Sequence, residues 1–126
     1  MIDKLALVAL GGACGASLRY LGVTLFTRVA GDPAFGTLFV NIAGSFAMGF
    51  VVVLLGERLP EPATRMIPFL ATGLLGGFTT FSAFSLDTIR LMESGKTGLA
   101  IAYVLASVFI SILALGAGLW IGRTSL

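Results

Sequence analysis

The sequence predicts an all-α membrane protein with four transmembrane helices. Of its 126 residues, 57% are hydrophobic and only 11% are charged, whereas a soluble domain carries about 25% charged residues. A spanning helix needs roughly 20 mostly apolar residues, and four stretches of the chain meet that requirement. These stretches and their short connections account for most of the chain, so we expect residues 1–126 to form a single transmembrane domain.

The four predicted spans are Leu5–Val29, Gly36–Leu55, Met66–Leu91 and Thr97–Ile121. The first span is apolar for longer than the core of a signal peptide, which is about 7–15 residues, so we interpret it as a retained helix. Three of the four prolines lie in two of the connections, and the fourth lies in the first turn of the third span, where a proline costs little. The predicted connections are Ala30–Phe35, Gly56–Arg65 and a turn around Ser94–Lys96.

Small residues recur four positions apart on the predicted spans. Such spacing lets helix backbones approach closely in lipid, where hydrophobic collapse gives no drive. The pattern predicts a tightly packed bundle and indicates an oligomer, although packing within one chain would explain any single pair. The pairs are Gly11 with Gly15, Gly12 with Ala16, Ser45 with Gly49, Gly73 with Gly77, and Gly118 with Gly122.

The basic residues are nearly balanced between the two predicted sides of the membrane. Orientation follows the difference in Lys and Arg between sides, so balance favours insertion in both orientations and antiparallel pairing of subunits. A single orientation set by other factors is the alternative. One side would hold Lys4, Arg58, Arg65 and Arg123, and the other Arg28, Arg90 and Lys96, with Arg19 added if its side chain extends to that surface.

The third span contains a poor helix centre. Gly76 and Gly77 are followed closely by Thr79 and Thr80, and each glycine costs about 1 kcal/mol relative to alanine in a helix. We therefore expect a break near the middle of the membrane. Irregular backbone at that depth persists only where it is buried in protein or lines a wet cavity, and its free carbonyls can coordinate a cation. The alternative is a continuous helix whose Thr and Ser side chains bond back to carbonyls.

Aromatic and polar side chains follow the predicted break. Phe81 and Phe84 share one helix face, Phe78 would lie one turn earlier, and Ser82 and Ser85 form a neighbouring polar row. Ring edges carry partial positive charge and can hold an anion, although an aromatic row more often serves packing.

Polar side chains also lie within the other spans. Asn41, the only asparagine, should face the bundle interior, because an amide is costly in lipid, and its NH₂ could donate to an anion or a carbonyl. The hydroxyls of Tyr103, Ser107 and Ser111 lie on one face of the fourth span and could be donors to an ion or bonds between helices. Arg19 could extend to the surface, attract anions or lock helix packing.

These residues lie in three motifs that resemble the Fluc (CrcB-type) family of fluoride channels. The resemblance covers nearly the whole chain, with the motifs in order on the expected helices. They are Gly11–Tyr20 (GGACGASLRY), Gly36–Asn41 (GTLFVN) and Gly76–Ser85 (GGFTTFSAFS).

The resemblance implies an antiparallel, dual-topology homodimer in the cell membrane with two separate fluoride pores that export cytoplasmic fluoride. It implies that the ring edges of Phe81 and Phe84 face the ion, and that Asn41 helps to coordinate it. A structural Na⁺ on the dimer axis, bound by the main-chain carbonyls of Gly76 and Thr79, is also implied, with no organic cofactor. The remaining implied residues are Thr37, Ser82, Tyr103, Ser107 and Ser111 in the pore and Arg19 at its vestibule.

Two positions depart from the residues common in that family. Ala83 stands where the family commonly has Thr, which removes a hydroxyl, and Asp87 stands where it commonly has Glu. We expect these changes to affect conduction rate and pore access more than the function itself.

The composition weighs against other classes of function. A proton-coupled multidrug exporter of this size needs an acid in its first helix, and Leu5–Val29 contains none. A non-transporting assembly subunit would leave the costly polar residues without a role. One cysteine and no histidine exclude a disulfide within the chain and a Cys/His metal site. Eight basic residues are too few and too dispersed to bind nucleic acid. The spans contain no paired carboxylates, histidine base or activated nucleophile, so we do not expect an enzyme.

Overall fold

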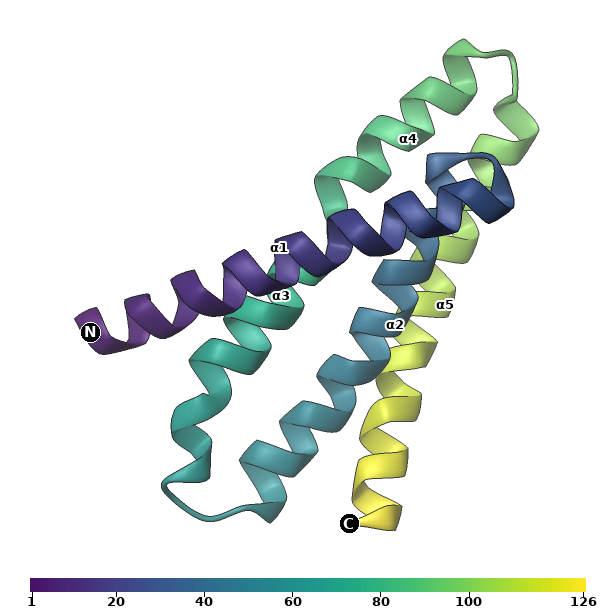
Figure 1. The fold of residues 1–126 in the computed structure, drawn as a ribbon. Helices are drawn as coiled ribbons and strands as arrows, with labels where there is room; N and C mark the ends of the chain where they lie inside the picture. The colour runs from purple at the N-terminus through teal and green to yellow at the C-terminus, as the bar shows by residue number, and fades with distance from the viewer.

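The computed structural model of residues 1–126 is built entirely from helices and short connections (Figure 1). Four helical stretches are long and apolar enough to cross a membrane, which confirms the predicted all-α fold. The elements are α1 (Ile2–Ala30), α2 (Pro33–Val53) with a π-helical extension η1 (Leu54–Arg58), the 3₁₀ turn η2 (Ala63–Met66), the π-helical η3 (Pro68–Leu75), α3 (Gly76–Phe78), α4 (Phe81–Glu93) and α5 (Thr97–Ser125).

A tight turn joins α1 to α2. Gly31, in the left-handed region at φ 88°, ends α1, and its N–H donates to the carbonyl oxygen of Thr27 at 2.8 Å. The side chain of Asp32 then accepts a hydrogen bond from the Ala34 N–H at 2.9 Å, and Pro33 takes the first helical position. This cap starts α2 three residues before the predicted Gly36, so the predicted connection Ala30–Phe35 was too long.

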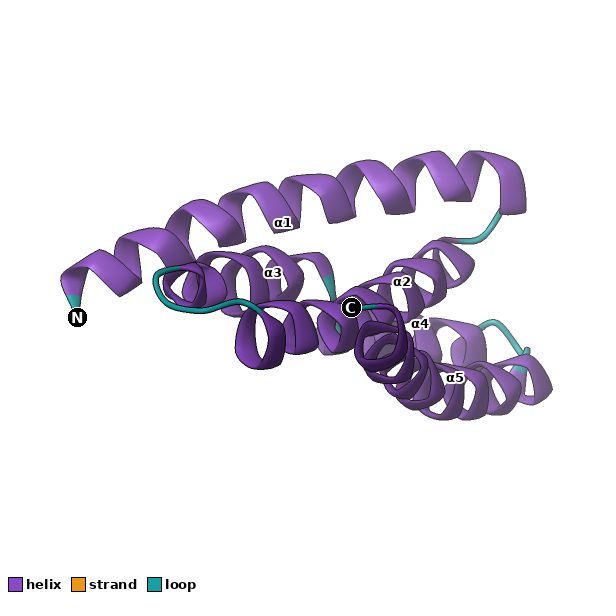
Figure 2. Cartoon of the chain, turned by 90° about the horizontal axis from the view of Figure 1, so that it is seen from below, coloured by secondary structure: helices purple, strands orange, loops and turns teal.

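The helices form two packed groups. α2 lies beside α5 along most of its length, whereas α1 packs mainly on η3 and also contacts α2 and α3. Figure 2 shows α1 as a separate layer over the other helices. The third span belongs to both groups, because its first half contacts α1 and its second half, α4, contacts α5.

Glycine makes both contacts close, as predicted. A Cβ added at Gly15 would overlap the Leu74 carbonyl oxygen of η3, and one added at Gly118 of α5 would overlap the Phe46 carbonyl oxygen of α2. Backbone therefore lies directly on backbone in each group. Not every small residue of the pattern works in this way, since Gly12 has open space where its Cβ would be.

The third span is interrupted at Thr79 and Thr80, next to a cluster of glycines. These two extended residues form the interruption. α3 ends at Phe78, and Thr79 (φ −87°, ψ 157°) and Thr80 (φ −153°, ψ 122°) are extended. The Thr80 hydroxyl then accepts a hydrogen bond from the Ala83 N–H at 3.1 Å, which caps α4. Because of the extended residues, Phe78 does not lie one helical turn before Phe81, and that detail of the prediction was wrong. The depth of the interruption in a bilayer stays a prediction.

Polar contacts tie the helix ends together at the end of the molecule that carries the C-terminus. Glu57 of η1 pairs with Arg123 of α5 at 2.9 Å, and Arg58 donates to the Arg123 carbonyl oxygen at 2.6 Å. Both partners of the ion pair are about half exposed, so its contribution to stability is small.

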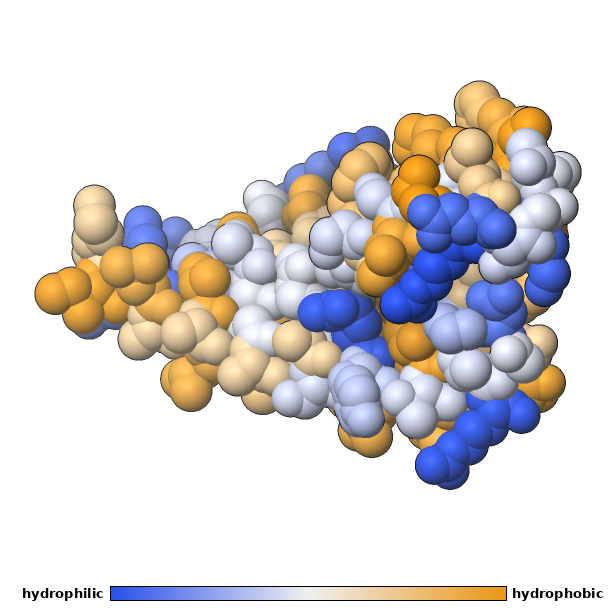
Figure 3. Space-filling view, turned by 90° about the horizontal axis from the view of Figure 1, so that it is seen from above, coloured by the Kyte–Doolittle hydropathy of each residue, from blue (hydrophilic) through white to orange (hydrophobic).

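Much of the surface is apolar, as a lipid-facing surface requires. Leu113 and Trp120 of α5 are 71% and 67% exposed. Seen from above (Figure 3), hydrophilic side chains gather mainly at the broad end of the molecule, and hydrophobic side chains cover much of the narrow end.

Candidate functional site

A cavity of about 380 Å³ lies between α2, the interruption, α4 and α5. None of the residues that line it is charged. One part of the lining is polar or aromatic and includes residues of the predicted site; the other part is aliphatic, with one glycine. The lining residues are Asn41, Gly44, Ser45, Met48, Thr79, Thr80, Phe81, Phe84, Ser107, Val108, Ser111, Ile112 and Leu115.

Asn41 of α2 binds the interruption through both ends of its amide. Its Oδ1 accepts a hydrogen bond from the Thr80 N–H at 2.7 Å, and its Nδ2 donates to the Thr80 carbonyl oxygen at 3.0 Å. Of the two partners considered for the NH₂ group, a carbonyl is therefore the one found in this chain. One N–H of the amide stays available to a ligand in the cavity.

Phe81 and Phe84 form an aromatic pair at the start of α4. Their ring centroids are 5.3 Å apart with the planes at 59°, and Phe84 also contacts Tyr103 at 5.4 Å. Phe84 is buried at 8% exposure, whereas Phe81 is 77% exposed. Both line the cavity, but only Phe84 is held by neighbours within the chain.

Ser107 and Ser111 of α5 line the same cavity one helical turn apart. The Oγ atoms of both are buried and have no hydrogen-bond partner. A buried hydroxyl without a partner costs about 1–3 kcal/mol, so these two groups are unusual. They are donors available to a bound ion.

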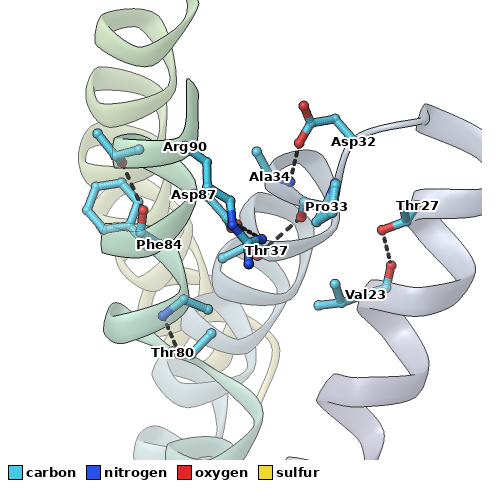
Figure 4. Close-up of polar contacts among 12 residues, drawn as sticks. Val23, Thr27, Asp32, Pro33, Ala34, Thr37, Thr80, Phe84, Asp87 and Arg90 are labelled. Carbon is cyan, nitrogen blue, oxygen red and sulfur yellow. Dashed lines mark hydrogen bonds and ion pairs between the residues drawn. The ribbon is translucent and has the colours of Figure 1, made fainter. Parts of the chain in front are cut away.

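Tyr103 belongs to a different cluster at the end of the bundle. Its hydroxyl donates to Asp87 Oδ2 at 3.3 Å, and Asp87 Oδ1 lies 3.8 Å from Arg90 Nη1. Asp87 and Arg90 project from α4 toward the first turn of α2 (Figure 4), where Thr37 is buried and donates to the Pro33 carbonyl oxygen at 3.2 Å. Neither Tyr103 nor Thr37 lines the main cavity.

Asp87, like its partner Arg90, is a member of this cluster that sequence reasoning did not assign to the site. It is only 5% exposed, and it lines a smaller cavity of about 170 Å³ together with Asp32, Arg90 and Lys96. A carboxylate predicted inside an apolar span is the signal that could have identified it, because such a group needs a partner.

Arg19 of α1 points into the protein instead of toward the surface. Its Nε donates a hydrogen bond to the Gly77 carbonyl oxygen at 3.0 Å. Of the three roles considered, locking of helix packing is therefore the one that fits this contact. Arg19 does not line the main cavity.

Carbonyl groups are free at Thr79 and upstream of it. The carbonyl oxygens of Gly76, Phe78 and Thr79 accept no hydrogen bond, whereas the Gly77 oxygen is bound by Arg19. Free backbone oxygens of this kind are suitable ligands for a hard cation.

The main cavity thus brings together five of the predicted pore residues, Asn41, Phe81, Phe84, Ser107 and Ser111. Ser82 lies outside it, exposed, with its hydroxyl 3.3 Å from that of Thr80. Fold and site together define a small multi-pass membrane protein with an uncharged polar and aromatic cavity that opens onto the surface between α2, α4 and α5.

Comparison with known proteins names the family. The profile of the CrcB-like protein, Camphor Resistance (CrcB) family matches residues 6–119, so the chain belongs to the CrcB family. A protein of Cereibacter sphaeroides strain ATCC 17029 is 54% identical over 94% of each chain. One of Chelativorans sp. strain BNC1 is 54% identical over 97% of this chain and 98% of its own, and one of Agrobacterium fabrum is 53% identical over 95% and 96%. All three are called "Fluoride-specific ion channel FluC".

Proposed function

We propose that the protein is a fluoride-selective ion channel that lets cytoplasmic fluoride leave the cell down its electrochemical gradient and so lowers fluoride toxicity. The observation that carries this function is the pair of unpartnered hydroxyls, Ser107 and Ser111, facing a cavity that Asn41 and the two phenylalanines also line. Relatives with about half of their residues identical bear the name of a fluoride channel.

The chemistry of the cavity suits a small, strongly hydrated anion. Hydroxyl and amide N–H groups can replace water molecules around fluoride one at a time, and the edges of Phe81 and Phe84 carry partial positive charge. No fixed cation lines the cavity, so an ion would not be trapped there. Selectivity would come from the number and rigidity of the donors.

Fluoride efflux from liposomes tests this function. Purified protein is reconstituted, a fluoride or a chloride gradient is imposed, and the released anion is followed with an ion-selective electrode. We expect rapid release of fluoride and retention of chloride in vesicles that contain protein. Vesicles that retain both anions would contradict the proposal.

Two other functions have less support. A proton-coupled multidrug exporter needs a buried acid in α1, and the chain has none between Leu5 and Val29. An assembly subunit without transport gives no role to the unpartnered hydroxyls of Ser107 and Ser111, which cost stability.

The functional unit in this proposal is an antiparallel homodimer with two pores. The near balance of basic residues between the two sides supports dual topology. The 77% exposure of Phe81, a residue that lines the cavity, supports a second subunit that covers it. Light scattering in detergent should give the mass of a dimer. In a background without Cys14, Ser94→Cys should be labelled from each side of the membrane in about half of the molecules.

A structural Na⁺ is proposed on the dimer axis. The free carbonyls of Gly76 and Thr79, close together in the chain and with Gly76 exposed, fit such an ion; two copies would supply four oxygens. When bound, the ion neutralises carbonyl dipoles that face one another across the axis. We expect fluoride efflux to fall when Na⁺ is replaced by a large organic cation on both sides.

The proposed channel is a multi-pass membrane protein, which in bacteria lies in the plasma membrane. The remaining predicted residues, Thr37, Ser82 and Tyr103, are proposed to line the route beyond the main cavity. Arg19 keeps its predicted place at the vestibule.

A further inference from the structure

Arg19 is the only charged residue between Leu5 and Thr27 of α1, and its polar contact within the chain is with the third span. The Nε atom, not a terminal Nη atom, donates to the Gly77 carbonyl oxygen at 3.0 Å, and the side chain is partly buried. Arg19 forms no ion pair with a carboxylate. Its contact is therefore with backbone, two residues before the interruption.

Gly77 is also held to α1 by close packing. A Cβ at Gly77 would lie 2.8 Å from the Gly12 carbonyl oxygen, so α1 and α3 are in backbone contact at this point. The hydrogen bond from Arg19 adds direction to that contact, because it determines where the Gly77 carbonyl points.

The interruption is thus fixed from two helices. Asn41 of α2 binds both backbone groups of Thr80 on the downstream side, and Arg19 of α1 binds Gly77 on the upstream side. The carbonyls of Phe78 and Thr79, between these two anchors, stay free.

We propose that Arg19 is a positioning residue for the interruption, and that fluoride conduction requires its Nε–H hydrogen bond to Gly77 and not its charge. This inference rests on the proposed fluoride channel function. It differs from an anion-attracting role at a vestibule, in which the charge would be essential and the identity of the donor atom would not.

The two roles can be separated with three substitutions at the same position. In glutamine, Nε2 stands the same number of bonds from Cα as Nε in arginine, so Arg19→Gln keeps the donor and removes the charge. Arg19→Lys keeps the charge but places a methylene at the donor position. Arg19→Met removes both and keeps similar bulk.

Maximal fluoride efflux is measured for each variant in liposomes. We expect Arg19→Gln to stay within about threefold of the wild type, and Arg19→Lys and Arg19→Met to lose about tenfold or more, because the Gly77 carbonyl then loses its hydrogen-bond donor. The fluoride concentration that gives half-maximal flux, and the dependence on ionic strength, should not change. A charge role predicts the reverse order, with Lys active, Gln inactive, and a defect that grows at low fluoride.

Elution volume and thermal unfolding in detergent exclude misfolding as the cause of a lost flux. If Arg19→Gln does not fold, replacement of Arg19 by citrulline gives a second test, because citrulline keeps the shape and the Nε–H but carries no charge. A folded citrulline protein that does not conduct would overturn the inference, as would equal flux in all variants. Failure of the channel function itself would be recognised separately, since wild-type vesicles would then retain fluoride.

Discussion

The amide of Asn41 pairs with Thr80 in the way that a neighbouring β-strand would, accepting from its N–H at 2.7 Å and donating to its carbonyl at 3.0 Å. Thr80 is extended and has no helical partner for either group. A side chain on α2 thus satisfies backbone that the third span cannot satisfy itself.

Asn41→Ala should destabilise the protein and reduce conduction together. The substitution leaves two backbone groups of Thr80 without partners, which we expect to cost about 2–4 kcal/mol, and fluoride efflux should fall at least about tenfold. Thermal unfolding in detergent and liposome efflux measure the two effects. Thr124→Ala, at the exposed end of α5, is the control, and full thermal stability of Asn41→Ala would show that the contact is unimportant.

Ser107→Ala and Ser111→Ala should separate stability from function. Because neither Oγ has a partner, its removal should leave stability unchanged or raise it by about 1 kcal/mol. Efflux should nevertheless fall about three- to tenfold for each variant, and further for the double variant, since donors to the ion are lost.

The matched control for the two serines is Ser17→Ala, whose hydroxyl lies on an exposed face of α1 and bonds to the Ala13 carbonyl oxygen. Its flux should equal that of the wild type. A clear loss of stability in Ser107→Ala or Ser111→Ala would mean that these hydroxyls have structural partners.

Phe81→Ile and Phe84→Ile should both reduce efflux about tenfold or more while the protein still assembles. Their effects on stability should differ within the chain, because Phe84 is buried against Tyr103 and Phe81 is 77% exposed. We expect a cost of about 1–2 kcal/mol for Phe84→Ile and little for Phe81→Ile. Normal flux in both variants would show that the ring edges of Phe81 and Phe84 take no part in conduction.

Gly118→Ala should destabilise the contact between α2 and α5 by about 1–3 kcal/mol, because the added methyl group overlaps the Phe46 carbonyl oxygen. Gly116→Ala, two residues away with open space around it, should be neutral or stabilising by up to about 1 kcal/mol. Thermal unfolding compares the two variants, and equal melting temperatures would contradict the close contact.

The sequence predicts the fold well because lipid imposes simple rules on it. Length and apolar composition locate four spans, and the run from Gly76 to Thr80 is too poor a helix former to continue unbroken. The start of α2 is less predictable. Whether Pro33 terminates a loop or begins a helix depends on whether Asp32 caps it, and this depends on the geometry of the turn at Gly31.

The site is only partly predictable, since a polar residue in a span needs a partner that the sequence does not name. Asn41 is expected to face the interior, and it meets the hydroxyl-bearing face of Ser107 and Ser111 in one cavity. Tyr103 lies on the same face of α5 as the two serines, yet its hydroxyl bonds to Asp87. Such pairings depend on the angle at which α4 packs against α5. The periodicity of residues along one helix does not determine that angle.

The backbone of Thr80 finds its partner only on α2, and this has a consequence for biogenesis. In hydrocarbon each unsatisfied backbone group costs several kcal/mol, so with Thr80 at its predicted depth the third span cannot enter lipid alone during synthesis at modest cost. Residues 33–93 must instead leave the translocon as one hairpin, so that α2 stays in the translocon until α4 has been synthesised. A ribosome stalled before α4 has emerged should therefore leave that hairpin unfinished and open to proteolysis.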